Sequence, residues 1–354
     1  MSSNSTREFI KHVLMFLPTA LAGLLLMLVV IGTWVSAILN SPEMYVDAPR
    51  IIQNFTRSLY WQARTDWQGI PECAQFDPVT LYRPRPGQCR FRNAEFDTVM
   101  RFDFAGARAT AGSAANPGLE KSAVRRAIVL GDSFAMGWGV SDSDAFAAFL
   151  ASEHNVPAVN LGVSSYGTAR ELLRLQDWGA LAPNDVLVIQ YCDNDYEENL
   201  HFSATGRVGP YTPADLEPIQ QRQPVAARPL PLAGRLLRLM FRQLLDTLKT
   251  RGSDVPSPSM SPAAAFLAVL DSFPDVRRHR IFIVPINEHG RISHLFEDRT
   301  LIESAGLSLV VPALKDDSFF PLDGHLTPEG HRLVAASVAG AIAASGQVQS
   351  TSAH

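Results

Sequence analysis

The chain has few cysteines and no excess of positive charge. Its 354 residues include three cysteines, and 31 Lys and Arg face 35 Asp and Glu, which leaves a formal net charge of −4. Proteins that bind nucleic acid usually carry a basic patch or block, so we expect no nucleic-acid partner. No CxxC pair and no HExxH spacing occurs, and nothing in the sequence predicts a metal site or another cofactor.

Charged residues are also missing from Val13 to Leu39, a run dominated by Leu, Val, Ala, Met and Ile. Such a run is long enough to cross a bilayer with some tilt. Residues 1–12 carry Arg7 and Lys11, which favours a cytoplasmic tail and export of the remainder. We therefore predict a single-pass anchor over 13–39 with the main domain on the periplasmic or extracellular side. A cleaved signal peptide is the alternative.

The three cysteines fall into a pair and a single residue. Cys73 and Cys89 lie in residues 40–122, a juxtamembrane region with aromatic-rich alternating stretches that ends in an Ala-, Gly- and Ser-rich linker. An exported domain sits where disulfides persist, so we predict a Cys73–Cys89 bridge. Two unpaired thiols or half of a metal site are the alternatives. Cys192 lies in an apolar run and is expected to be a small core residue.

From Arg126 onward, short apolar runs alternate with segments of helical periodicity. Strands that are apolar on both faces are typical of a parallel sheet covered by helices. We predict a flavodoxin-like α/β/α sandwich over residues 123–346, followed by a disordered tail over 347–354. The expected strands are 127–132, 157–163, 185–191, 280–286 and 307–314, and the expected helices are 142–154, 167–181, 261–273 and 327–345.

Residues 201–260 interrupt this alternation. The segment is rich in proline at first and then contains an amphipathic stretch with Arg235, Arg238 and Arg242 on its polar side. We interpret it as an insertion whose helix lies on the surface of the domain or acts as a lid. A helix that lies on a membrane surface is the alternative.

A serine follows the first predicted strand, at the edge of the sheet where such folds bind ligands. Ser133 stands in the sequence Gly131-Asp132-Ser133, and a serine nucleophile needs a base that a third group orients. Asp323 and His325 follow the last predicted strand and precede a helix. Residues two apart in an extended segment project to one side, so Asp323 is expected to reach His325.

The neighbouring strands end in groups that can bind an oxyanion. Asn194 follows the third predicted strand, and the small-residue loop 162–168 follows the second. Side-chain amides and backbone N–H groups are the usual donors at such a position. The sequence therefore predicts a nucleophile, a base and oxyanion donors at one sheet edge.

These blocks resemble those of the SGNH, or GDSL-like, hydrolases, which are serine esterases and acyltransferases. Gly131-Asp132-Ser133, Asn194-Asp195 and the final Asp323 and His325 occur in the family's order. The resemblance implies catalysis by Ser133, His325 and Asp323, with Ser133 N–H, Ser165 N–H and Asn194 as oxyanion donors. Two details depart from the family pattern. The last block is Asp-x-His rather than Asp-x-x-His, and Ser165 stands where a glycine is usual, which makes Gly167 the alternative donor.

The resemblance implies an acyl-enzyme on Ser133, whereas the Gly-x-Ser-x-Gly elbow of the α/β-hydrolases is absent. We expect a membrane-anchored esterase that removes acyl groups from a small molecule, a carbohydrate or an envelope glycan. An O-acyltransferase that moves acetyl groups onto an exported polysaccharide is one alternative. The other is a non-catalytic scaffold or glycan-binding protein of the envelope. The sequence assigns no protein partner.

Overall fold

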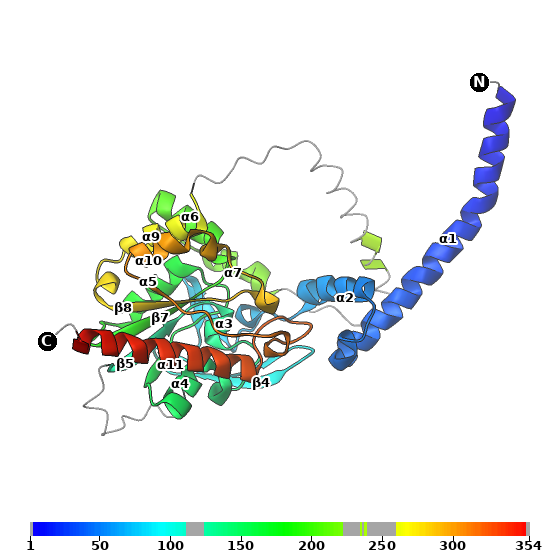
Figure 1. The fold of residues 1–354 in the computed structure, drawn as a ribbon. Helices are drawn as coiled ribbons and strands as arrows, with labels where there is room; N and C mark the ends of the chain where they lie inside the picture. Colours follow the sequence, from blue (N-terminus) through cyan, green and yellow to red (C-terminus); the bar gives the residue numbers. More distant parts are fainter. Residues whose placement is uncertain (1–2, 111–123, 222–233, 236, 239–259, 352–354) are drawn as a thin grey trace. The chain divides into compact units, whose positions relative to one another are not determined.

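The computed structural model describes residues 3–110, 124–221, 234–235, 237–238 and 260–351 (Figure 1). The chain divides into two compact units. The first contains Met1–Arg64 with Pro224–Pro256, and the second contains Thr65–Gln223 with Ser257–His354. Most of the amphipathic stretch predicted in the 201–260 insertion lies outside the described residues.

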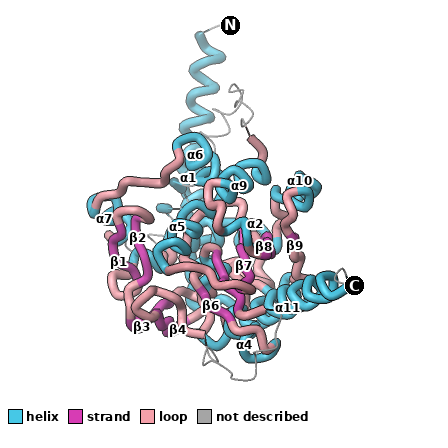
Figure 2. The backbone as a smooth tube through the Cα atoms, turned by 90° about the vertical axis from the view of Figure 1, so that its left-hand side faces the viewer, coloured by secondary structure: helices cyan, strands magenta, loops and turns pink. Residues whose placement is uncertain are grey.

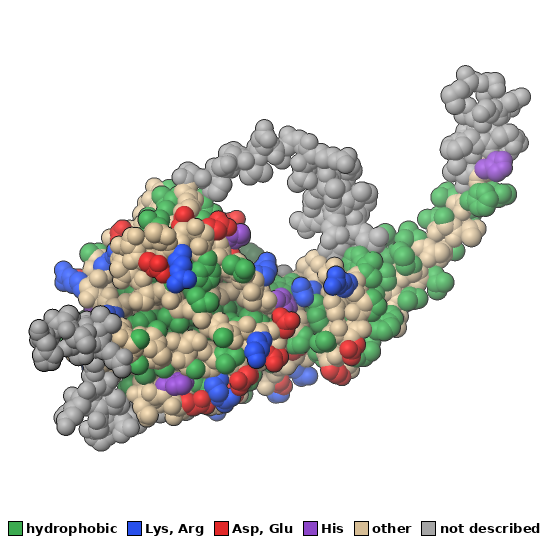
Figure 3. All heavy atoms as spheres, viewed as in Figure 1, with side chains coloured by type: hydrophobic (Ala, Val, Ile, Leu, Met, Phe, Trp, Pro, Cys, Tyr) green, Lys and Arg blue, Asp and Glu red, His purple; other side chains and the backbone are tan. Residues whose placement is uncertain are grey.

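The first unit contains α1 (Ser3–Asn40), a short 3₁₀ turn η1 (Pro42–Tyr45) and α2 (Arg50–Ala63). The stretch Met15–Asn40 is long and apolar enough to cross a membrane by length and composition, with a mean hydropathy of 2.4. Apolar side chains line much of the part of α1 that is not grey in the space-filling view (Figure 3). The apolar run of the sequence thus forms one continuous helix.

The second unit is built on a five-stranded parallel sheet with the strand order β6-β5-β7-β8-β9 (Figure 2). Four strands lie within predicted apolar runs, and β5 begins one residue before its run, at Arg126. This confirms the predicted α/β fold. The strands are β5 (Arg126–Leu130), β6 (Ala158–Asn160), β7 (Asp185–Tyr191), β8 (Arg280–Pro285) and β9 (Ser308–Leu309).

Successive strand residues point to opposite faces of the sheet. Since the side chains on both faces are apolar, helices cover both faces. Val129 and Val188 pack in one core with α4 (Phe146–His154) and α11 (Pro328–Thr351). Ile128 and Ile189 pack in the other core with α5 (Thr168–Trp178) and α9 (Pro262–Asp271). The remaining helical elements are α3 (Ser133–Met136), η4 (Asp142–Asp144), α6 (Asp195–Thr205), α7 (Pro213–Gln220), η6 (Val276–Arg278), η7 (Glu288–Gly290), η8 (His294–Asp298), α10 (Arg299–Ser304) and η9 (Asp316–Ser318).

The structure differs from the prediction at the C-terminal end of the domain and agrees with the expectation for Cys192. Helix α11 continues to Thr351, past the start of the tail expected at 347, because adding residues to an existing helix costs far less than starting one. Cys192 is buried at the end of β7, and its Sγ lies 3.2 Å from Asn287 Oδ1.

Residues 65–110 form two antiparallel hairpins that belong to the second unit. After the 3₁₀ turn η2 (Trp67–Gly69), β1 (Ala74–Asp77) pairs with β2 (Leu81–Pro84), and β3 (Gly87–Arg92) pairs with β4 (Asp97–Phe102). Their buried side chains share a third core with residues that follow β5 and β6, including Trp138 and Tyr166. This module, defined as residues 65–110, therefore packs on the carboxyl edge of the sheet. The sequence predicts one juxtamembrane region over residues 40–122, whereas the structure divides that region at Thr65.

A disulfide joins Cys73 to Cys89 within the module, with a Cα–Cα distance of 5.2 Å and a sequence separation of 16. Closing a loop of this length restricts the unfolded chain and is worth about 3 kcal/mol. We expect the paired substitution Cys73→Ala and Cys89→Ala to lower the free energy of unfolding by about 3 kcal/mol. Chemical denaturation of the full chain measures this change. Cys192→Ala is the matched control for loss of a thiol without loss of a bridge, and equal unfolding curves for the paired variant and the parent would contradict the prediction.

Candidate active site

The nucleophile candidate lies where β5 ends in a sharp turn. Gly131 has φ +143°, and a Cβ there would lie 2.6 Å from Ala135 Cβ, so the turn requires glycine. Asp132 then caps α3, and its carboxylate accepts the Phe134 N–H at 2.8 Å. Ser133 is the first residue of α3 and is 7% exposed. The strand-to-helix turn thus fixes Ser133 at the carboxyl edge of the sheet.

His325 lies directly beside this serine. Ser133 Oγ is 2.8 Å from His325 Nε2, and the other ring nitrogen, Nδ1, is hydrogen-bonded to the Asp323 carboxylate. Asp323 is fully buried and His325 nearly so. A histidine bonded in this way at both nitrogens can accept a proton from the serine while the carboxylate holds the ring. The structure therefore brings together the three residues that the sequence predicted.

The short Asp-x-His spacing is accommodated by a tight loop. The Phe320 N–H donates to His325 O at 2.8 Å, and the Gly324 N–H donates to Phe320 O at 2.8 Å. Gly324 has φ +85°, and a Cβ there would lie 2.6 Å from His289 Nε2. The glycine between Asp323 and His325 lets the chain reverse within one residue, so both side chains still face each other.

The imidazole is packed between aromatic rings. Trp138 stacks on His325 with ring centroids 4.8 Å apart and an interplanar angle of 18°, and Phe134 lies 4.7 Å from the same ring. Phe91 from β3 meets Trp138 edge-on at 4.6 Å. The module thus supports the ring that stacks on His325. Sequence reasoning missed this contribution, because no local pattern marks a contact between residues far apart in the chain.

The oxyanion donors predicted from the sequence lie at the ends of β5, β6 and β7. Within the described part of the chain, the backbone N–H groups of Ser133, Ser165 and Gly167 have no hydrogen-bond acceptor. Ser165 is exposed, and its Oγ accepts a hydrogen bond from Gln68 Nε2 of the module at 3.3 Å. Asn194 is exposed at the start of α6. Three backbone donors and the Asn194 side chain therefore lie at this edge.

The loop after β6 is fixed by its own side chains and by the module. Asn160 donates to Ala135 O at 2.9 Å and accepts the Gly162 N–H at 3.0 Å. The Tyr82 hydroxyl donates to Ser164 O at 2.7 Å. These bonds connect the loop that carries Ser165 to the turn that carries Ser133, and they hold the candidate donors in place before any ligand binds.

Ser165 occupies a backbone conformation that suits glycine. Its φ is +59°, in the left-handed region that costs an ordinary residue about 1–2 kcal/mol. We expect Ser165→Gly to raise the free energy of unfolding by about 0.5–1 kcal/mol, since glycine also gains freedom in the unfolded chain. The backbone N–H remains, so esterase activity should persist. Chemical denaturation and an ester assay measure the two effects.

The matched control for Ser165→Gly is Ser143→Gly. Ser143 is an exposed serine within the 3₁₀ turn η4, and it is not among the residues with positive φ. Glycine there relieves no strain and should leave stability unchanged or lower it. A Ser165→Gly protein that is less stable than its parent would contradict the strain argument.

Sequence reasoning missed a group of buried carboxyls beside the nucleophile. Asp132, Glu171 and Asp195 are each at most 2% exposed. Burial raises the pKa of Asp132 to about 6, although the hydrogen bond from the Phe134 N–H lowers it. Burial and then the charge of a neighbouring carboxyl raise the pKa of Glu171 and of Asp195 well above their ordinary values. Glu171 lies in the first turn of a helix, where a glutamate ordinarily indicates a solvated surface position.

Sequence reasoning also missed Glu95, in the turn between β3 and β4. Its carboxylate accepts the N–H groups of Leu322 and Asp323. Burial raises the pKa of Glu95 to about 7, although these two N–H groups lower it. No motif marks this residue, because its contact with the Asp323 loop exists only in the folded chain.

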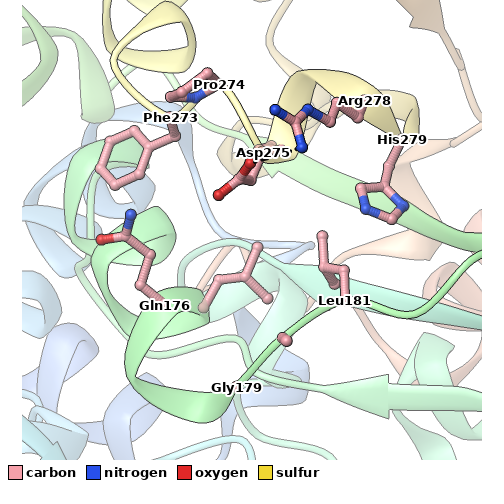
Figure 4. A pocket seen from close by; sticks show the side chains of 11 residues that line it. Gln176, Gly179, Leu181, Phe273, Pro274, Asp275, Arg278 and His279 are labelled. Carbon is pink, nitrogen blue, oxygen red and sulfur yellow. Dashed lines mark ion pairs between the residues drawn. The ribbon is translucent and has the colours of Figure 1, made fainter.

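A pocket of about 530 Å³ lies elsewhere on the second unit (Figure 4). Its lining includes Leu181, which precedes β7, and His279, which precedes β8. Ser133 follows β5, and these strands are parallel. The pocket is therefore at the amino edge of the sheet, opposite the candidate active site. Among the described residues, no group of three or more His, Cys, Asp or Glu is arranged to hold a metal ion.

A search of solved structures found several that are similar to this chain at low sequence identity. A lipolytic protein of the G-D-S-L family from Desulfitobacterium hafniense DCB-2 has 14% identity and a TM-score of 0.34, over 60% of this chain and 97% of its own. A carbohydrate acetylesterase family member from Sinorhizobium meliloti has 17% identity and a TM-score of 0.32, over 61% and 97%. A carbohydrate esterase family 2 enzyme with a carbohydrate binding domain, from Corynascus thermopiles (Myceliophthora fergusii), has 14% identity and a TM-score of 0.31, over 63% and 67%.

A search of curated proteins found no match to the chain. The family model described as GDSL-like Lipase/Acylhydrolase family matches residues 129–333, which is more than half of the sequence. The matched range begins within β5 and ends within α11, so it contains Ser133, Asn194, Asp323 and His325. The chain belongs to the GDSL-like lipase/acylhydrolase family and is an ester-hydrolysing enzyme.

Proposed function

We propose that the protein cleaves acyl esters through a covalent acyl-enzyme, with Ser133 as nucleophile, His325 as base and Asp323 as the group that orients His325. The observation that carries the proposal is the pair of contacts on one imidazole. Ser133 Oγ lies 2.8 Å from His325 Nε2, and Asp323 is bonded to Nδ1 of the same ring. This arrangement puts the acceptor lone pair of the ring toward the serine.

In the first half of the reaction, Ser133 Oγ attacks the ester carbonyl carbon and His325 Nε2 accepts the hydroxyl proton. The tetrahedral intermediate then expels the alcohol, which takes that proton from His325, and the acyl group remains on Ser133. In the second half, His325 takes a proton from water as the water oxygen attacks the acyl carbon. The carboxylic acid leaves and Ser133 regains its proton.

The oxyanion of each intermediate needs donors at the same edge. We assign this role to the N–H groups of Ser133 and Ser165 and to the Asn194 side chain, with Gly167 N–H as the alternative to Ser165. The N–H groups are supported by their lack of an acceptor within the described ranges. Preorganised donors of this kind contribute about 10²–10³-fold in rate each.

We further propose that α1 anchors the enzyme in a membrane and that its substrates are acetylated carbohydrates or envelope glycans. The anchor is supported by the length and hydropathy of Met15–Asn40. Arg7 and Lys11 before the apolar run, together with the Cys73–Cys89 disulfide, favour an exported catalytic unit.

The test uses the full chain in detergent. A fluorophosphonate probe should label the protein with a stoichiometry of one at Ser133, and an acetyl ester of nitrophenol should be hydrolysed. Absence of both labelling and hydrolysis would contradict the proposal and would favour a scaffold or glycan-binding role. Adding an oligosaccharide and measuring how the acetyl group divides between water and sugar distinguishes hydrolysis from transfer.

A further inference from the structure

The turn of the β3–β4 hairpin reaches the loop that carries Asp323 and His325. Glu95 Oε1 accepts the Leu322 N–H at 3.0 Å, and Glu95 Oε2 accepts the Asp323 N–H at 2.6 Å. One carboxylate therefore holds two consecutive peptide N–H groups, one with each oxygen. The contact joins the module to the residue that is bonded to His325 Nδ1.

The hairpin turn is itself held in place on both sides of Glu95. Asn93 N–H donates to Phe96 O at 3.0 Å, and the Asn93 side chain exchanges hydrogen bonds of 2.8 and 3.0 Å with the Thr65 backbone. The Phe96 ring lies 5.5 Å from the Phe320 ring, at the base of the Asp323 loop. Glu95 thus extends from an anchored support and is not a mobile surface side chain.

The chemistry of the contact fits a carboxylate better than an amide. A carboxylate offers an acceptor oxygen to each N–H, whereas a glutamine offers one oxygen and directs N–H groups at the second donor. The contact also has a cost, because Glu95 is partly buried and lies near the buried Asp323 carboxylate. The two N–H bonds offset that cost only while the Leu322–Asp323 backbone keeps its position.

That position matters because the loop is short. One residue, Gly324, separates Asp323 from His325, and it has a left-handed backbone. A rotation of the peptide before Asp323 therefore moves its carboxylate relative to the ring, and no longer loop is available to compensate. A misplacement of about 1 Å in a catalytic group can cost about 10²-fold in rate.

We propose that Glu95 is a positioning residue that fixes the Asp323 backbone so that the Asp323 carboxylate orients His325. This inference rests on the proposed function, since it assigns Glu95 a role through Asp323. The module is thereby part of the working site, and not only a support for the fold.

The test compares Glu95→Ala and Glu95→Gln with the parent in the full chain. We expect Glu95→Ala to lower kcat about 10²-fold with little change in KM. The kcat of Glu95→Gln should lie between those of Glu95→Ala and the parent, because glutamine keeps one acceptor oxygen. Activity is divided by the fraction of protein that a fluorophosphonate labels at completion. A merely structural role would lower that fraction and leave kcat per labelled site unchanged, which would overturn the proposal.

Two further variants make the test specific. Glu72→Ala removes an exposed glutamate from the same module and should keep the parent kcat. In an Asp323→Ala background, Glu95→Ala should cause little further loss, because residues that act through one another are not additive. Effects that multiply would show that Glu95 acts independently of Asp323 and would overturn the inference. If Ser133→Ala keeps the parent activity, the proposed function fails instead, and the two failures are thus distinguished.

Discussion

Replacing Ser133 with alanine is expected to lower kcat for an acetyl ester by about 10⁵-fold or more and to abolish fluorophosphonate labelling. The hydroxyl that lies 2.8 Å from His325 Nε2 is removed, so no acyl-enzyme can form. KM and the unfolding curve should change little, because Ser133 Oγ is a small group at the edge of the core. The measurements are steady-state ester hydrolysis and the stoichiometry of labelling on the full chain.

Ser143→Ala is the matched control for this substitution. Ser143 is an exposed serine ten residues along the chain, in η4, and its hydroxyl lies 3.4 Å from Asp144 Oδ1 rather than beside a histidine. It should be labelled and active like the parent. Labelling that persists at the parent level in Ser133→Ala would remove Ser133 from the role of nucleophile.

Replacing Asp323 with asparagine is expected to lower kcat by about 10³–10⁴-fold, with KM nearly unchanged. In the parent, the Asp323 carboxylate accepts a hydrogen bond from His325 Nδ1–H, which leaves Nε2 free to accept from Ser133. An amide at this position can donate to Nδ1 instead, and the ring proton then moves to Nε2, the wrong side for a base. Fluorophosphonate labelling should still reach completion, but slowly.

Asp317→Asn is the matched control for Asp323→Asn. Asp317 is exposed in η9, a few residues before the Asp323 loop, and its loss should leave kcat at the parent value. Parent-like turnover in Asp323→Asn would show that another group orients His325. The shortened Asp-x-His spacing makes this comparison informative, because a single left-handed residue, Gly324, separates the two side chains.

The sequence carried enough information to predict the sheet and the three central residues. Five short runs that are apolar on both faces predicted the five strands. A strand that helices cover on both sides must be apolar on both faces. In a parallel sheet the carboxyl ends of the strands share one edge. That rule predicts that Ser133, Asn194 and His325 lie at a common edge.

The sequence alone determined the α/β fold and the apolar helix. It also determined the likeness of the Ser133, Asn194 and Asp323–His325 blocks to a hydrolase family. Periodicity and the residue types at strand ends can be read from consecutive residues, so no tertiary contact is needed to find them. Only the tertiary structure decided that Ser165 adopts a left-handed backbone, that Trp138 stacks on His325 and that Glu95 reaches the Asp323 loop. The Trp138–His325 and Glu95–Asp323 contacts join segments far apart in the chain. Packing of the whole domain selects them, and no local pattern encodes them.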